Sequence, residues 1–260
     1  MNKILRILTI VSCLAWTAAS VPADEAFHCE VLSMTGIAHV ARASGETALL
    51  KEGDLLSEGD SIEVSENGTL DLAYDKEWNN VVHLEKGAKA KVESISPAKL
   101  GLNDGAVYAR LKKLPATSSF DVQTPTAVAA VRGTEYRTVV HDGQTEIFNF
   151  SSSKVFVYGV DEGGHKSEEP PAVLESEQKT SVESAGEPPK APQTMETHEK
   201  TACEVSQKAI VTQVERAVTE GRIGKIQTVT EIESTLQSRK SKAQYDEESR
   251  VTDTRRRSFK

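Results

Sequence analysis

The stretch FDVQTPTAVAAVRGTEY, from Phe120 to Tyr136, carries the strongest local signals for the fold. Its first residues alternate apolar and polar side chains, as a half-buried β-strand does. Pro125 lacks a backbone N–H and biases Thr124 toward extended geometry, so we expect the strand to end or turn there. Gly133 suits a positive φ angle or a close backbone approach. The stretch therefore predicts β-structure interrupted by two tight turns.

The same signals continue on both sides of this stretch. Apolar and polar residues alternate in 70–74, 88–92 and 107–111, and turn-forming pairs separate the runs at Gly53-Asp54, Gly59-Asp60, Asn67-Gly68, Lys86-Gly87, Asp104-Gly105 and Asp142-Gly143. This spacing is typical of an all-β sandwich, barrel or solenoid. Asp142-Gly143 is the clearest hairpin signal, because both residues accept the positive φ angles of a type I′ turn.

Four motifs resemble the FecR domain of exported bacterial proteins in order and in spacing. They are GDLLSEGDSI at 53–62, NGTLDL at 67–72, NDGAVYARL at 103–111 and the block at 120–136. The resemblance covers about residues 30–182 and implies a mainly β fold, an all-β domain of short strands that is barrel-like or solenoid-like. Its structural motif residues here are Gly53, Asp54, Gly59, Asp60, Thr124, Pro125, Arg132, Gly133 and Thr134.

The resemblance has limits. The family usually has glycine where this chain has Ser153, and its late Gly-Gln element appears here as Glu177-Gln178. The protein that names the family also has a membrane helix and a cytoplasmic sigma-factor regulator. The motifs match only its periplasmic part, so the resemblance does not imply sigma-factor regulation.

The beginning of the chain resembles a secretory signal peptide over residues 1–23. A basic start at Lys3 and Arg6 precedes a short apolar run that ends in small residues. We therefore expect a periplasmic or secreted protein with no membrane span. A lipid anchor at Cys13 is the alternative, because Ile10-Val11-Ser12-Cys13 resembles a lipoprotein cleavage box.

The rest of the chain divides by composition. We expect the β-domain over 26–183, a disordered Pro/Glu-rich linker over 184–200, amphipathic helices over 201–242 and a charged disordered tail over 243–260. Most of the Glu-, Ser- and Pro-rich stretch from Asp161 should be flexible, although Ala172-Val173-Leu174 could add a strand to the domain. Helical spacing of apolar residues in 205–236 suggests that these helices need a partner surface, either a second copy of the chain or the β-domain itself.

Charge and residue spacing exclude several function classes. The formal net charge is −8, and removing residues 1–23 takes away Lys3 and Arg6 and no acidic residue, which leaves −10. An acidic chain lacks the electrostatic footprint of a nucleic-acid binder. The six histidines show no zinc-ligand spacing, and the serines no nucleophile elbow. We expect no enzyme, no cofactor and no metal site.

The remaining function is binding. A protein or cell-wall glycan of the bacterial envelope is the expected partner, and a structural protein that self-assembles through residues 205–236 is the alternative. Arg132 either ties two turns together, for instance by clamping Glu135, or is exposed to an acidic partner. Trp78, Asn79 and Asn80 form either a contact loop or a packed loop. Cys29 and Cys203 could form a disulfide, stay free, or pair between molecules.

We predict that the native product is processed and carries no lipid. Intact-mass measurement should place its first residue between Ala19 and Asp24, because the small residues there fit the cleavage rule. A product that begins at a diacylglycerol-modified Cys13 would contradict this prediction.

Overall fold

The computed structural model of the chain describes residues 28–112, 114 and 119–221. It is mainly β, with 48% strand and one helix among these residues, so the predicted fold class is confirmed. The strands do not close into a barrel. They form two sheets instead, called the sandwich below. The chain passes repeatedly from one sheet to the other.

The first sheet, called sheet A, is antiparallel throughout. In spatial order it contains β4 (Leu55–Leu56), β1 (Cys29–Thr35), β6 (Thr69–Ala73), β7 (Asn80–Leu84), the second half of β9 (Ala98–Leu111), β12 (Glu135–His141), β13 (Gln144–Asn149), β16 (Gln178–Val182) and β17 (Gln193–Thr194).

The second sheet, called sheet B, is antiparallel except where β9 and β10 run parallel. In spatial order it contains β3 (Thr47–Leu49), β2 (Ala38–Ala41), β5 (Ser61–Val64), β8 (Lys89–Ile95), the first half of β9, β10 (Phe120–Gln123), β11 (Ala127–Val131), β14 (Val155–Gly159) and β15 (Ala172–Leu174).

Strand β9 belongs to both sheets. Its first residues pair with β8 and β10, and its last residues pair with β7 and β12. The strand changes sheets at Asp104-Gly105, where Gly105 has a φ of 85° and a Cβ would lie 2.7 Å from the Cα of Ala88. Only glycine fits this bend, because a side chain would meet both an unfavourable φ angle and a neighbouring backbone.

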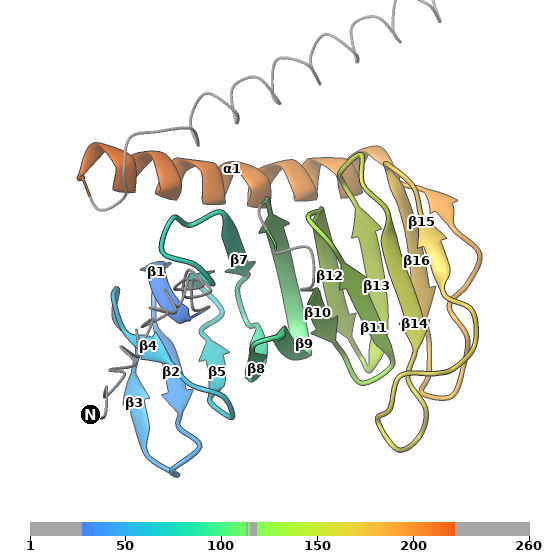
Figure 1. Cartoon of the computed structure of the whole chain (residues 1–260), viewed down its shortest axis with the longest axis horizontal. Helices are drawn as coiled ribbons and strands as arrows, with labels where there is room; N and C mark the ends of the chain where they lie inside the picture. Colours follow the sequence, from blue (N-terminus) through green and yellow to red (C-terminus); the bar gives the residue numbers. More distant parts are fainter. Residues whose placement is uncertain (1–27, 113, 115–118, 222–260) are drawn as a thin grey trace, which may run out of the picture.

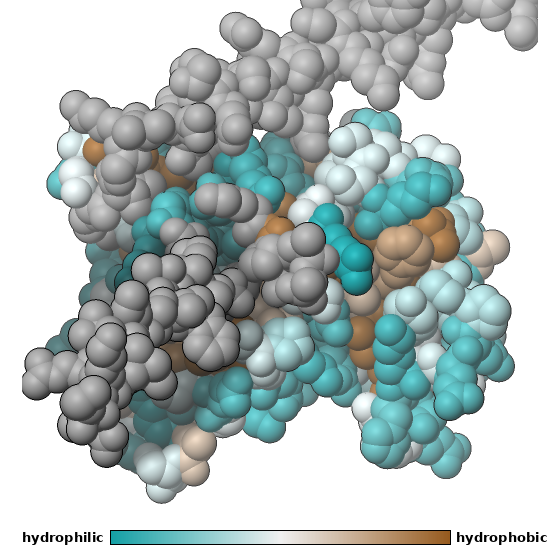
Figure 2. Space-filling model, in the orientation of Figure 1, coloured by the Kyte–Doolittle hydropathy of each residue, from teal (hydrophilic) through white to brown (hydrophobic). Residues whose placement is uncertain are grey.

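The main core lies between the two sheets. Alternate residues of each strand point into it, for example Val107, Ala109 and Leu111 of β9, which are at most 2% exposed. On the side seen in Figure 2, hydrophilic residues dominate the described surface and apolar residues form scattered patches between them. The strands thus follow the two-residue period that the alternating runs predicted.

The stretch that suggested the fold forms β10, a turn and β11. The turn at Thr124-Pro125 is held by hydroxyl groups, because the Oγ1 of Thr124 accepts from the N–H of Ala127 at 2.9 Å and lies 2.7 Å from the Oγ1 of Thr145. Gly133 has a φ of 74°, as expected for the second turn. Both predicted turns are confirmed.

The predicted hairpin at Asp142-Gly143 is also confirmed. Strands β12 and β13 pair from Tyr136–Asn149 to His141–Gln144, which leaves a two-residue loop. Asp142 has a φ of 51° and Gly143 a φ of 76°, the signs that a type I′ turn requires.

The Pro/Glu-rich stretch differs from the expected flexible linker. The predicted strand at Ala172–Leu174 exists as β15, and β16 and β17 follow it. Within 184–200, the N–H of Gly186 donates to the carbonyl of Val160, and the N–H of Lys190 donates to Ser181. Backbone hydrogen bonds to the sandwich thus hold a stretch whose side chains bury little apolar surface. The N-terminal 1–23 segment, residues 222–242 of the predicted helical segment and the 243–260 tail lie outside the described residues.

Helix α1 (Thr197–Thr219) lies across sheet A, as Figure 1 shows. It begins four residues earlier than expected, inside the predicted linker. The N–H of Glu196 donates to the carboxylate of Glu199 at 2.7 Å, which satisfies a backbone donor at the helix start.

We predict that Ile147→Ala lowers the free energy of unfolding by about 2–5 kcal/mol, because Ile147 is 0% exposed between the sheets and the truncation leaves a cavity. Chemical denaturation measures the change. Leu49→Ala is the matched control, because Leu49 is 56% exposed and should change stability by less than about 0.5 kcal/mol. Equal midpoints for Ile147→Ala and wild type would show that the core lies elsewhere.

Candidate functional site

The candidate site lies where α1 meets sheet A. One face of the helix packs on the outer side of the sheet and forms a second apolar cluster, separate from the main core. The helix contributes Cys203, Ile210, Val214 and Ala217, and the rest of the molecule contributes Leu32, Ala73, Trp78, Val81, Tyr108, Phe148, Phe150 and Met195. Sheet A is therefore buried on both faces.

Charged side chains lie beside this second cluster. Asp71 accepts a hydrogen bond from Ser33 at 2.5 Å and lies 2.7 Å from the Nδ1 of His83. The guanidinium of Arg137 binds both carboxylate oxygens of Glu85 at 2.7 Å. These partners come from sheet A or from the turn after β7, so both carboxylates are hydrogen-bonded without the helix.

A third charged pair lies deeper. The Nε of Arg110, which is 1% exposed, lies 3.6 Å from Glu135, and the hydroxyl of Tyr108 donates to the same carboxylate at 3.3 Å. From the helix, the side-chain amide of Gln207 donates to Glu135. Ser206 of the helix donates to Glu85 at 2.8 Å. The helix thus contributes neutral donors to carboxylates that the sheet already pairs.

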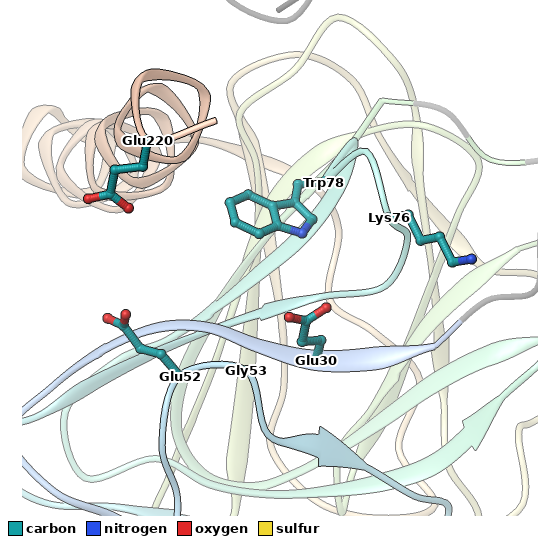
Figure 3. A pocket seen from close by; sticks show the side chains of 6 residues that line it. All are labelled: Glu30, Glu52, Gly53, Lys76, Trp78 and Glu220. Carbon is teal, nitrogen blue, oxygen red and sulfur yellow. The ribbon is translucent and has the colours of Figure 1, made fainter. Parts of the chain in front are cut away.

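At its C-terminal end α1 borders an open cleft of about 600 Å³. The cleft is lined by Glu30, Glu52, Gly53, Lys76, Trp78 and Glu220. We call it the helix-end cleft. In Figure 3, Glu30 and Glu52 point from the sheet side toward the helix, the indole of Trp78 lies between, and the side chain of Lys76 points away. The cleft is acidic, because its lining contains three carboxylates and one lysine.

Further groups surround the cleft. Arg216 donates to Glu220 at 2.8 Å, and the hydrogen bond and charge of Glu220, together with the charge of Glu52, raise the pKa of Arg216. Leu55 pairs directly with Glu30 across β4 and β1 and is 61% exposed. An exposed leucine on an edge strand therefore adjoins the acidic cleft.

The predicted contact loop is a packed loop. Trp78 has a φ of 55° and is 5% exposed, because its ring packs against the helix and the outer face of sheet A. Asn80 is buried and Asn79 is half-buried. The carboxylate of Asp75 accepts the N–H groups of both asparagines, at 3.0 and 2.7 Å, and so fixes the loop. Of the three, only Trp78 borders the helix-end cleft.

Of the two alternatives for Arg132, the structure shows the exposed side chain rather than a buried tie between two turns. The acid suggested as its partner, Glu135, binds Arg110 instead. The structure does not place Arg132 among the residues of the helix-end cleft.

The other motif residues shape turns. Asp60 is 1% exposed, and its carboxylate accepts from the N–H groups of Ser57 and Ala43 and from Arg42. Asp54 accepts from the N–H of Lys51 at 2.8 Å. Aspartate beside glycine serves here as a turn-forming residue, and among the described residues no group of His, Cys, Asp or Glu could hold a metal ion.

The two cysteines among the described residues are free thiols, so the suggested Cys29–Cys203 disulfide is not formed. Cys29 lies in the main core and Cys203 in the cluster under α1, on opposite faces of sheet A. Burial raises the pKa of each thiol to about 12.

Sequence reasoning missed the charged pairs on the outer face of sheet A. Arg110 follows Ala109 in an alternating run, and Glu135 and Arg137 flank Tyr136 in another, so the period of two assigned all three to the outer face. Nothing in the local sequence said that a helix from beyond residue 196 would cover them.

In the described part of the chain, no helix is long and apolar enough to cross a membrane.

We predict a pH-dependent contribution from Glu85. Burial raises its pKa, but the hydrogen bond and charge of Arg137 and the hydrogen bond from Ser206 outweigh burial and hold the pKa below 4.5. The stabilisation is therefore complete above about pH 4.5 and is lost as the pH falls through the lower, folded-state pKa.

Glu85→Gln should cost about 1–3 kcal/mol of unfolding free energy at pH 7, and the difference from wild type should narrow below about pH 4.5. Denaturation at several pH values measures it. Glu63→Gln is the control, because Glu63 is an exposed carboxylate 3.9 Å from Lys89. A difference for Glu85→Gln that stays constant down to pH 3 would contradict the prediction.

No curated protein matches this chain. Two crystal structures of a candidate anti-sigma factor from Parabacteroides distasonis ATCC 8503 are similar, at 17% and 16% identity, each with a TM-score of 0.43 and covering 55% of this chain. The chain spans 63% and 62% of the length of those two structures.

The profile of the FecR protein family matches residues 55–153, from the start of β4 to the turn before β14. Three of the motifs that suggested the resemblance, at 67–72, 103–111 and 120–136, lie wholly inside this range. Residues 55–153 are therefore similar to the FecR protein family, and they contain strands β4 to β13 of the two sheets.

Proposed function

We propose that this protein is a non-enzymatic interaction module of the bacterial cell envelope that binds a protein partner at the helix-end cleft. The cleft carries this proposal, because it combines a concave acidic surface with an exposed apolar residue, Leu55, beside it. No cofactor or metal is part of the proposal.

A protein partner suits the chemistry of this surface. Within the described residues, β4 pairs with β1 only, and the carbonyl of Leu55 accepts a hydrogen bond from the guanidinium of Arg42 at 2.9 Å, so the side chains rather than the backbone of this edge are offered to a partner. Leu55 on this edge supplies apolar area, and Glu30, Glu52 and Glu220 favour a partner with basic side chains.

A glycan partner receives less support. Sugar recognition by tryptophan needs an accessible ring face, and the ring of Trp78 is packed under α1. The protein arm of the expected function is therefore the one we propose.

Export to the periplasm or out of the cell is part of the proposal. Residues 1–23 have the three-part composition of a secretory signal, although they lie outside the described residues. The FecR domain is consistent with this location, since the resembling domains occur in exported bacterial proteins.

Self-assembly through the helices has a weaker basis over the described part of the helix. The apolar stripe of α1 packs on sheet A of its own chain, so this stripe is already occupied. Residues 222–236, which completed the expected self-association segment, lie outside the described residues.

We predict that Leu55→Asp abolishes partner binding and leaves the fold intact, since Leu55 is exposed and contributes little to the core. Pull-down from envelope extract should recover one distinct protein with the wild-type chain, and recovery should fall at least tenfold with Leu55→Asp. Leu49→Asp is the matched control, because Leu49 is similarly exposed but lies on sheet B. Equal recovery by all three chains, or recovery of this chain alone, would refute the proposed site.

A further inference from the structure

We propose that α1 is a strap that opens as a unit while the β-sandwich stays folded, and that its docking completes the helix-end cleft. What the cleft binds rests on the proposed function; the opening of the strap does not. The contacts between the helix and the sheet carry this inference.

The first step concerns charge. A buried charge that loses its partner is costly, and this cost normally locks a covering element in place. Here the partners of the covered charges are in the sheet: Asp71 with His83, Glu85 with Arg137, and Arg110 with Glu135. If α1 lifts, each pair stays together and gains water.

The second step concerns what the helix contributes. Ser206 and Gln207 donate neutral hydrogen bonds to Glu85 and Glu135, and water can replace both donors. Glu199 pairs with Lys179 at the edge of the interface, where the lysine would become solvated. Glu177 beside β16 likewise pairs with Lys200 of α1, so among the described residues the ion pairs that depend on the helix are these two, and both residues would become solvated when it lifts.

The third step concerns the core. The apolar residues of α1 belong to the second cluster, and the main core between the sheets contains no residue of the helix. Helix opening therefore removes one layer and leaves the packing between sheets A and B unchanged. Regions of this kind open at lower free energy than the global unit.

The fourth step links the strap to the cleft. Glu220 lines the cleft from the end of α1, and Trp78 lines it from a loop that packs in the same cluster as the helix. Opening of α1 removes one wall of the cleft and uncovers the ring that forms another. A partner that binds the intact cleft therefore favours the docked helix.

The two cysteines provide a matched pair of reporters. Cys203 is 0% exposed and lies on the face of α1 that packs on sheet A, whereas Cys29 is 0% exposed and lies between the sheets. If the strap opens alone, a thiol reagent reaches Cys203 and does not reach Cys29. If the molecule opens only as a whole, both thiols react at the same rate.

The experiment is labelling of the full mature chain with a maleimide under native conditions, followed by peptide mapping of each cysteine. We expect Cys203 to react at least tenfold faster than Cys29. Ile210→Ala, which trims the helix side of the second cluster, should raise the labelling rate of Cys203 about tenfold further and leave the labelling rate of Cys29 unchanged. Ile147→Ala, which trims the main core, should speed the reaction of Cys29.

Equal labelling rates for both cysteines in the wild-type chain and in Ile210→Ala would overturn the strap. The labelling result is separate from the partner-binding result, because no partner is present. A mobile strap with no effect of Leu55→Asp on recovery would sink only the proposed function, whereas a rigid strap with a strong Leu55→Asp effect would sink only this inference.

Discussion

The architecture depends on β9, which alone among the described strands belongs to both sheets. Its pairing with β8 and β10 at one end and with β7 and β12 at the other joins the two layers through continuous backbone. Because side chains alternate, the position of Val107 in the main core fixes Tyr108 and Arg110 on the opposite face. A slip of one residue would exchange the two sets and bury Arg110 among apolar residues.

This constraint explains the charges under α1. The outer face of sheet A alternates as a solvent-facing sheet does, and then a helix covers it. The resulting ion pairs are weak support for stability, because burial costs much of what the attraction gains. Their value is geometric. Arg137 of β12 binds Glu85 at the end of β7 through two hydrogen bonds, and Glu135 of β12 pairs with Arg110 of β9. The two carboxylates then fix where Ser206 and Gln207 dock.

Local signals in the sequence predicted the β-rich fold, the Thr124-Pro125 turn, the Asp142-Gly143 hairpin and the strand at Ala172–Leu174. Each depends on neighbouring residues, through the period of two or through turn geometry. The sequence could not predict which elements cover which face. Trp78 and Arg132 show the difficulty, since the sequence left open whether each side chain is packed or exposed, and the structure packs Trp78 under a helix far along the chain and exposes Arg132. The helix-end cleft joins β1, two loops and the end of α1, so no local motif could mark it.

We infer that the sandwich around β9 unfolds as one cooperative unit and that α1 is a separable layer on it. Native-state hydrogen exchange of the full chain, followed residue by residue at increasing denaturant, tests this claim most directly. Amides of β9 and β12 should exchange only through global unfolding, whereas amides of α1 should exchange through an opening of lower free energy and weaker denaturant dependence. If the amides of α1 and β9 shared one opening free energy and one denaturant dependence, the claim would be contradicted.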